Sequence, residues 1–226
     1  VRNRLGIGGL RHRNATAVVA PRRREREATA DHEVTILVSE PLRPVLVLNP
    51  LWEKPTATVV LLHGLLQSGP MLERLARGLS KGLPFARFVA PTAPSMSSLF
   101  GYGPAWFDTT KPSEGRLPEH LEASAKELIN VLETEASISG APTQRLILVG
   151  FSAGGALGAY AALRAPFRVG GLALLGSAGL VPLGRAAAGL RTTGIPALQC
   201  HGQEDRMVSA ATAQESANWL RRQGCD

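Results

Sequence analysis

The sequence predicts an α/β protein, in which helices cover both faces of a mostly parallel sheet. From about Pro44 onward, short apolar runs typical of strands alternate with segments of helical periodicity, the order that builds parallel sheets. The 226 residues suffice for one such domain with a real core but are few for two. Hydrophobic residues make up 44% and charged residues 19%, which excludes a mostly disordered chain.

The first half of the domain is predicted to hold three strands and two helices. The expected strands are 45–48, 58–62 and 88–90, and the expected helices are 71–83 and 119–137. Leucines at helical spacing mark the first helix: Leu72, Leu75, Leu79 and Leu83. Between the last strand and the second helix, residues 91–118 are predicted to be one long irregular stretch. Loops of this length are usually functional or disordered.

The second half is predicted to alternate in the same way. Strands are expected over 145–149, 172–175 and 196–200, and helices over 153–163 and 209–222. A Gly-, Ala- and Pro-rich connection is expected over 178–195. Residues 146–163 carry no charge, but their glycine-rich interior suits a buried strand, a turn and a buried helix better than a membrane span. We therefore predict no transmembrane segment.

The positive charge of the chain lies almost entirely in its first 30 residues. This segment holds eight arginines and two glutamates, which is +6 of the net +7. An Arg-rich segment can bind nucleic acid or acidic lipid, or act as an organelle transit peptide, but residues 1–37 contain no serine. We expect residues 1–40 to form a basic arm that is disordered or targeting. The α/β domain is expected over 44–226.

The cysteines point to no disulfide framework and no metal centre. Cys200 and Cys225 are the two cysteines of the chain, and no Cys/His spacing resembles a zinc site. We expect no cofactor, no metal, no specific nucleic-acid partner and a cytoplasmic protein, with organelle targeting by the basic arm as the alternative.

The segment Gly150-Phe151-Ser152-Ala153-Gly154 fits the pattern G-x-S-x-G between a predicted strand and a predicted helix. In that context the serine lies on a sharp turn that lifts its hydroxyl above the sheet, and flanking side chains would clash. Ser152 is therefore the candidate nucleophile.

A second strand ends in Leu61-Leu62-His63-Gly64-Leu65. Backbone N–H groups just beyond such a strand, together with the N–H after the nucleophile, can stabilise a developing oxyanion. Leu65 and Ala153 are the candidate donors. For His63 a structural role, anchoring this loop, is favoured over a role as catalytic base.

The candidate acid follows the strand expected over 196–200. Asp205 and Glu204 both stand where a triad carboxylate belongs in the chain order Ser, acid, His. The pattern H-G-x-x-D-x-x-V from His201 to Val208 favours Asp205, and Glu204 is then a solvated neighbour.

From about Pro44 onward the chain resembles the acyl-protein thioesterase / phospholipase–carboxylesterase family of α/β-hydrolases. The matching pieces are His63-Gly64-Leu65 with Ser68-Gly69, Ala90-Pro91-Thr92-Ala93-Pro94, Trp106-Phe107-Asp108, Gly150 to Leu157, and Leu198 to Asp205. Trp106-Phe107-Asp108 is the most discriminating, and we interpret it as an aromatic anchor followed by a helix-capping aspartate. Family members often have Gly-Asp where this chain has Leu66-Gln67, and Gln where it has Ala153. These changes should spare main-chain oxyanion contacts but affect the fit of the acyl group.

The resemblance implies an α/β-hydrolase fold and hydrolysis of acyl esters or thioesters through an acyl-serine intermediate. Acylated proteins (palmitoyl-proteins among them), lysophospholipids and small esters are the implied substrates. A carboxylesterase or lysophospholipase is the alternative.

In the family that this chain resembles, the catalytic base is a histidine about thirty residues beyond the acid. No histidine follows Asp205 in this sequence. We expect the sequence to be truncated at its C-terminal part, with the catalytic His absent from this chain. An inactive acyl-binding homologue is the other interpretation.

Overall fold

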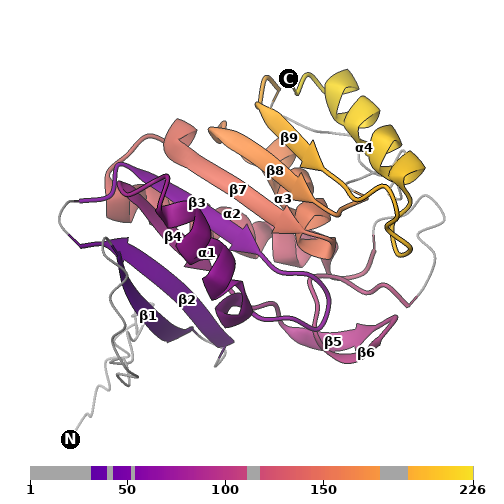
Figure 1. The fold of residues 1–226 in the computed structure, drawn as a ribbon, viewed down its shortest axis with the longest axis horizontal. Coiled ribbons are helices and arrows are strands. Elements are labelled where there is room, and N and C mark those ends of the chain that lie inside the picture. Colours follow the sequence, from indigo (N-terminus) through magenta and orange to yellow (C-terminus); the bar gives the residue numbers. More distant parts are fainter. Residues whose placement is uncertain (1–31, 40–42, 52–53, 111–117, 179–192, 226) are drawn as a thin grey trace, which may run out of the picture.

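The computed structural model describes residues 32–39, 43–51, 54–110, 118–178 and 193–225. A seven-stranded sheet runs through the molecule in the order β1-β2-β4-β3-β7-β8-β9, with helices on both sides (Figure 1). β1 and β2 pair antiparallel with each other, and β2 pairs antiparallel with β4, whereas the pairs from β4 to β9 are parallel. The predicted mostly parallel α/β architecture is confirmed.

The strands of the main sheet have lengths that are usual in globular proteins. They are β1 (His32–Ser39), β2 (Arg43–Pro50), β3 (Ala57–Leu62), β4 (Ala86–Ala90), β7 (Leu146–Phe151), β8 (Gly171–Leu175) and β9 (Ala197–Cys200). The helices are α1 (Glu73–Ser80), preceded by a 3₁₀ turn over Gly69–Leu72, α2 (Leu121–Ser139), α3 (Ala153–Arg164) and α4 (Ala210–Arg222). Each of these strands and helices overlaps an element predicted from the sequence, except β1.

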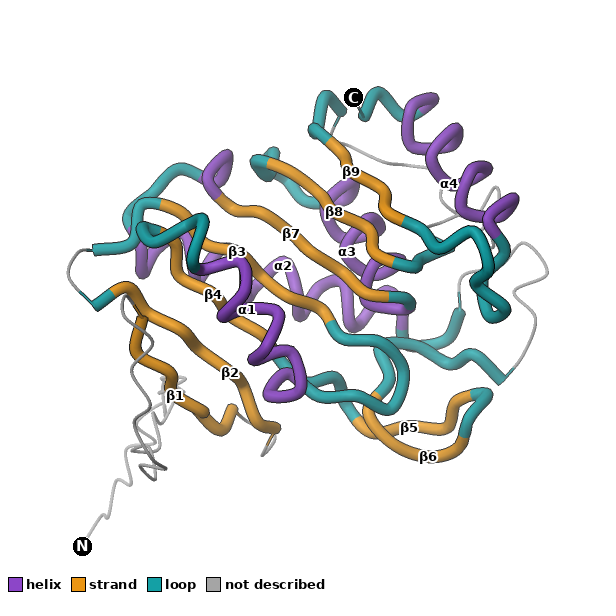
Figure 2. Tube along the Cα trace, in the orientation of Figure 1, coloured by secondary structure: helices purple, strands orange, loops and turns teal. Residues whose placement is uncertain are grey.

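Two apolar clusters form the core, one on each face of the sheet, because successive strand residues point to opposite faces. Val60 and Leu148 belong to the cluster that packs against α2 and α3 and includes Leu220 of α4. Val59 and Leu61 belong to the other, beneath α1. Figure 2 shows α1 in front of the sheet and α2 and α3 behind it. All four helices thus contribute apolar side chains to the core.

The prediction that no strand of the domain precedes Pro44 is wrong. β1 extends the sheet back to His32 and pairs with β2 along its whole length. The His32 side chain is buried, its Nε2 lies 2.9 Å from the carbonyl oxygen of Ala86, and its ring packs edge-on against Phe88. The run Val34-Thr35-Ile36 has the β-branched composition of a strand. The domain therefore begins by residue 32, and residues 1–31 lie outside the described ranges.

The predicted irregular stretch 91–118 contains a small hairpin. β5 (Ser95–Ser98) and β6 (Gly101–Pro104) pair antiparallel as a separate two-stranded sheet, so the prediction is wrong for these residues. Residues 111–117, and 179–192 of the predicted connection 178–195, lie outside the described ranges. None of the described helices combines the length and the apolarity that crossing a bilayer demands.

Candidate functional site

Ser152 occupies a sharp junction between β7 and α3. Its backbone has φ +52° and ψ −120°, a conformation that residues with side chains rarely adopt. Its N–H donates to the carbonyl oxygen of Leu175, at the end of the adjacent strand β8, over 2.9 Å. The serine is thus held at the carboxyl end of the sheet, where ligands bind in open α/β folds.

Gly150 and Gly154, on either side of Ser152, allow segments of the backbone to pack directly against each other. A Cβ on Gly154 would lie 2.4 Å from the carbonyl oxygen of Leu62, at the end of β3. A Cβ on Gly150 would lie 2.4 Å from the amide nitrogen of Gly155, in the first turn of α3. Real Cβ atoms essentially never come this close, so both positions require glycine.

The loop after β3 forms a four-residue turn beside this junction. Gln67 closes it twice, because its N–H donates to the Gly64 carbonyl over 3.3 Å and its Oε1 accepts from the Gly64 N–H over 2.9 Å. Leu66 lies third in the turn, with φ +59°, and its N–H donates to the carbonyl oxygen of Pro104 in β6 over 2.8 Å. The turn is therefore fixed at both Gly64 and Leu66.

The amides of Leu65 and Ala153 have no hydrogen-bond partner in the described part of the chain. Ala153 is the first residue of α3, where N–H groups have no acceptor within the helix. Leu65 lies in the turn that abuts this helix end. Two unpaired N–H groups beside a serine hydroxyl are chemically suited to stabilise an oxyanion.

His63 is buried and bonded through both ring nitrogens. Its Nε2 accepts from the N–H of Ala93 over 2.9 Å, which places the proton on Nδ1, 2.7 Å from the Gly64 carbonyl oxygen. Burial lowers the pKa of His63 to about 4, and the hydrogen bond to the Gly64 carbonyl acts in the opposite direction. The predicted structural role of this histidine is confirmed.

The low pKa of His63 predicts an acid-sensitive fold. Unfolded, this imidazole gains a proton near pH 6.5, whereas the folded protein resists it until about pH 4. The unfolding free energy should therefore fall as pH drops through this window, by about 3 kcal/mol in total. Chemical denaturation at pH 7, 5.5 and 4.5 would measure it. The His63→Gln variant should lose most of this slope, and an unchanged slope would contradict the assignment.

Asp205 lies over the end of β8, the strand next to the serine junction. Its Oδ1 accepts from the N–H groups of Val208 and Met207, over 3.0 and 2.8 Å, and these bonds hold the pKa of the carboxyl below its usual value. Its Oδ2 would lie 3.8 Å from a Cβ on Gly176, directly after β8. Asp205 is thus ionised and held through Oδ1, and its Oδ2 lies near the end of β8, the strand that pairs with β7. Glu204 is exposed.

None of the described histidines joins Ser152 to Asp205. His201 Nε2 is 3.5 Å from Asp205 Oδ2, but it is 2.7 Å from the carbonyl oxygen of Val208 and belongs to the same loop as the aspartate. Its Nδ1 is buried without a hydrogen-bond partner among the described residues. His32 lies near the far edge of the sheet, and His120 is exposed beside Glu119. The structure therefore brings the predicted nucleophile, oxyanion donors and acid to the carboxyl end of the sheet, and none of the described histidines lies between them as a base.

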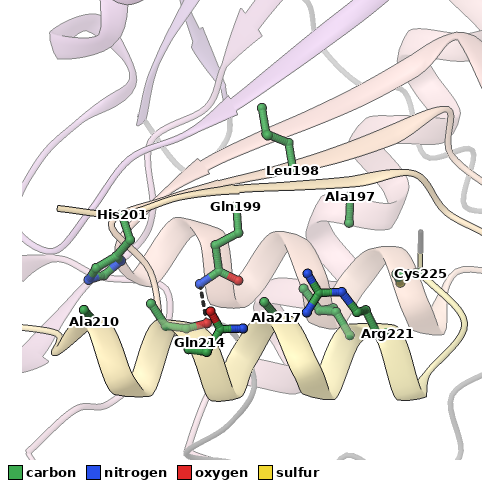
Figure 3. Close-up of a pocket in the computed structure, with 11 residues that line it drawn as sticks. Ala197, Leu198, Gln199, His201, Ala210, Gln214, Ala217, Arg221 and Cys225 are labelled. Atoms are coloured by element: carbon green, nitrogen blue, oxygen red, sulfur yellow. Dashed lines mark hydrogen bonds between the residues drawn. The ribbon is translucent and has the colours of Figure 1, made fainter. Parts of the chain in front are cut away.

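A cavity of about 490 Å³ lies along β9 rather than at Ser152. Figure 3 shows it between β9 and α4, with Gln199 and His201 directed toward the helix and Leu198 directed away. Ser152, Leu65 and Ala153 are not among its lining residues. Within the described ranges no three His, Cys, Asp or Glu side chains are grouped so as to hold a metal ion.

Trp106 is the aromatic anchor that the sequence predicts. Its indole Nε1 donates to the carbonyl oxygen of His63 over 2.8 Å, and the two rings lie 4.7 Å apart. The helix-capping role predicted for Asp108 is wrong. Its Oδ1 accepts from the N–H and the hydroxyl of Thr110, whereas α2 begins only at Leu121. Asp108 thus stabilises a local turn.

The profile of the phospholipase/carboxylesterase family matches residues 47–224. The chain belongs to the phospholipase/carboxylesterase family. Acyl-protein thioesterase 1 of Mycosarcoma maydis is 32% identical over 197 residues, 79% of this chain and 81% of that protein. An acyl-protein thioesterase 1 homologue of Dictyostelium discoideum is 34% identical over 163 residues, 68% of this chain and 72% of that protein. The crystal structure of Zea mays acyl-protein thioesterase 2 is similar with a TM-score of 0.63 and 30% identity, covering 80% and 84% of the two chains.

These similarities confirm the predicted α/β-hydrolase fold and the predicted family of the chain. As a phospholipase/carboxylesterase family member, the protein is assigned to the hydrolases of esters and thioesters. Leu66 and Gln67 are the residues near the site whose roles sequence reasoning missed. The sequence marks these two residues only by their difference from the Gly-Asp that family members often have. That difference does not predict that the Gln67 side chain accepts a hydrogen bond from the Gly64 N–H.

Proposed function

We propose that this protein hydrolyses acyl esters or thioesters through an acyl-enzyme intermediate on Ser152. The observation that carries the proposal is the strained backbone of Ser152 at the start of α3. The amides of Leu65 and Ala153, which have no hydrogen-bond partner among the described residues, lie at the same end of the sheet. The names of its relatives favour acylated proteins as substrates, with lysophospholipids and small esters as alternatives.

In the proposed reaction, the Ser152 hydroxyl loses its proton to a base, and its oxygen adds to the acyl carbonyl carbon. The carbonyl oxygen becomes an oxyanion that the Leu65 and Ala153 N–H groups stabilise. When the tetrahedral intermediate collapses, the alcohol or thiol departs with a proton and the acyl group stays on Ser152. Water then repeats the sequence and releases the carboxylic acid. Asp205 would orient an imidazole base through its Oδ2.

A second candidate function is acyl binding without catalysis. It is favoured by a specific observation on the described histidines. His32, His63 and His201 lie within hydrogen-bond distance of backbone carbonyl oxygens, and His120 lies 3.6 Å from the Glu119 carboxylate. A serine without a base stays a neutral alcohol at pH 7 and attacks a carbonyl slowly. The two candidates differ in whether Ser152 ever carries an acyl group.

Trapping the acyl-enzyme tests the proposal. Residues 1–226 incubated with p-nitrophenyl butyrate at pH 9, where hydroxide serves as base, should gain one butyryl group on the peptide that contains Ser152. A serine ester is much less reactive toward hydroxide than the activated p-nitrophenyl ester, so the adduct should accumulate, and acidification should preserve it for mass spectrometry. Ser152→Ala should remain unmodified at that peptide. Absence of the adduct from the parent protein, or an equal adduct in the variant, would favour the acyl-binding alternative.

A further inference from the structure

Leu66 adopts a backbone conformation that suits glycine far better than leucine. Its φ of +59° is left-handed, and its carbonyl-side neighbour Gln67 closes the turn onto Gly64. In such a turn the third residue is usually glycine or asparagine, because a Cβ is strained there. The chain thus keeps a leucine side chain at a position where the backbone alone would favour none.

The Leu66 side chain is placed against β6. Its Cδ2 would lie 2.9 Å from a Cβ on Gly103, and its N–H donates to the next residue, Pro104. The side chain nevertheless stays 37% exposed. An apolar surface is therefore presented next to Leu65, whose amide is the proposed oxyanion donor, since neighbouring Cα atoms are only about 3.8 Å apart.

The sheet order determines which part of a substrate would reach this surface. β7 carries Ser152, β3 and its turn lie on one side of it, and β8, β9 and Asp205 lie on the other. The base that Asp205 orients must protonate the leaving group, so the leaving group belongs on the β8–β9 side. The acyl chain then extends to the opposite side, toward the β3 turn and β6.

We propose that Leu66 is a specificity-determining residue that contacts the apolar acyl chain of the substrate. The inference rests on the proposed function and narrows it to acyl groups with an extended hydrocarbon chain. A polar or a very short acyl group would leave the exposed part of Leu66 in water and gain nothing from it. Gly103 leaves the room that the Leu66 side chain occupies.

Binding of octanoate, a medium-chain carboxylic acid product, tests this role without requiring catalysis. Octanoate titrated into residues 1–226 should shift the NMR signals of Leu65, Leu66 and Gly103. Asparagine tolerates the left-handed conformation but lacks the apolar surface of leucine. Leu66→Asn should therefore weaken octanoate binding at least about threefold. Leu37→Asn makes the same change at an equally exposed leucine on β1, at the edge of the sheet, and should leave the affinity unchanged.

A second pair of variants tests the contact with β6. Gly103→Ala should displace the Leu66 side chain and change octanoate affinity in the parent protein, but not in the Leu66→Gly background. The inference is overturned if octanoate does not bind the parent chain, or if Leu66→Asn binds it as well as the parent does. Equal losses in Leu66→Asn and Leu37→Asn would overturn it too. Failure to acylate Ser152 would refute the proposed function alone, because octanoate binding does not depend on that step.

Discussion

Residues 1–226 should hydrolyse p-nitrophenyl acetate at pH 7 only about 10³–10⁴ times faster than water does, which is what an oxyanion site and binding supply without a working triad. The reason is that the described histidines offer Ser152 no free imidazole, because both nitrogens of His63 are bonded and His201 is held by Val208. Initial rates for the parent protein and for Ser152→Ala measure the effect, and the two should be similar. Turnover typical of a complete triad, abolished by Ser152→Ala, would mean that a histidine of this chain acts as base.

Added imidazole should raise the rate, since Asp205 offers its Oδ2 to an imidazole N–H. After the hydrolysis that imidazole catalyses without protein is subtracted, the increase should be absent in Ser152→Ala. It should be strongly reduced in Asp205→Asn, which cannot orient or stabilise the imidazolium. Glu204→Gln is the matched control, because this exposed neighbour carries the same charge one residue away. Equal losses in the two carboxylate variants would show that Asp205 is not the acid.

Gly154→Ala should lower the unfolding free energy by about 3 kcal/mol or more. The new Cβ would lie 2.4 Å from the Leu62 carbonyl oxygen and 2.6 Å from that of His63. Both are backbone atoms of the β3 end, so α3 must move away from the sheet. Denaturant unfolding followed by circular dichroism measures the loss.

Gly78→Ala is the matched control, because it places the same methyl group in helix α1 with no heavy atom within 4 Å. There the higher helix propensity of alanine should stabilise the protein by up to about 1 kcal/mol. Similar stabilities for Gly154→Ala and the parent protein would contradict the packing described for the serine junction.

Much of the fold could be predicted because its signals are local. Apolar runs and helical leucine spacing are sufficient to locate β3, β7, α1 and α3, and the glycines around Ser152 to predict the sharp turn. β1 was missed although Val34-Thr35-Ile36 reads as a strand, because the basic segment before it dominates the composition of residues 1–40. The hairpin β5–β6 was missed because its residues are mostly small and polar, without an alternating pattern.

In the candidate site, too, the features set by local motifs could be predicted from the sequence, and those set by contacts between distant segments could not. The positions of Ser152, Asp205 and the two amides follow from motifs at strand ends, and their catalytic roles stay predictions. The bond from Gly64 to the Gln67 side chain, and the contact of Leu66 with Gly103, depend on which segments meet in space. No spacing along the chain contains that information.

The parallel pairing of β3 with β7 sets when the site can exist during folding. Thr58 pairs with Leu146 and Leu62 with Gly150, partners that are 88 residues apart in the chain. Closing a loop of this length costs conformational entropy before any contact repays it, and pairing of this kind is slow. The Leu65 amide arrives with β3, and Ser152 and Ala153 arrive with β7. During refolding the oxyanion site should therefore assemble only when this late step is complete, after β3 and β4 have already paired.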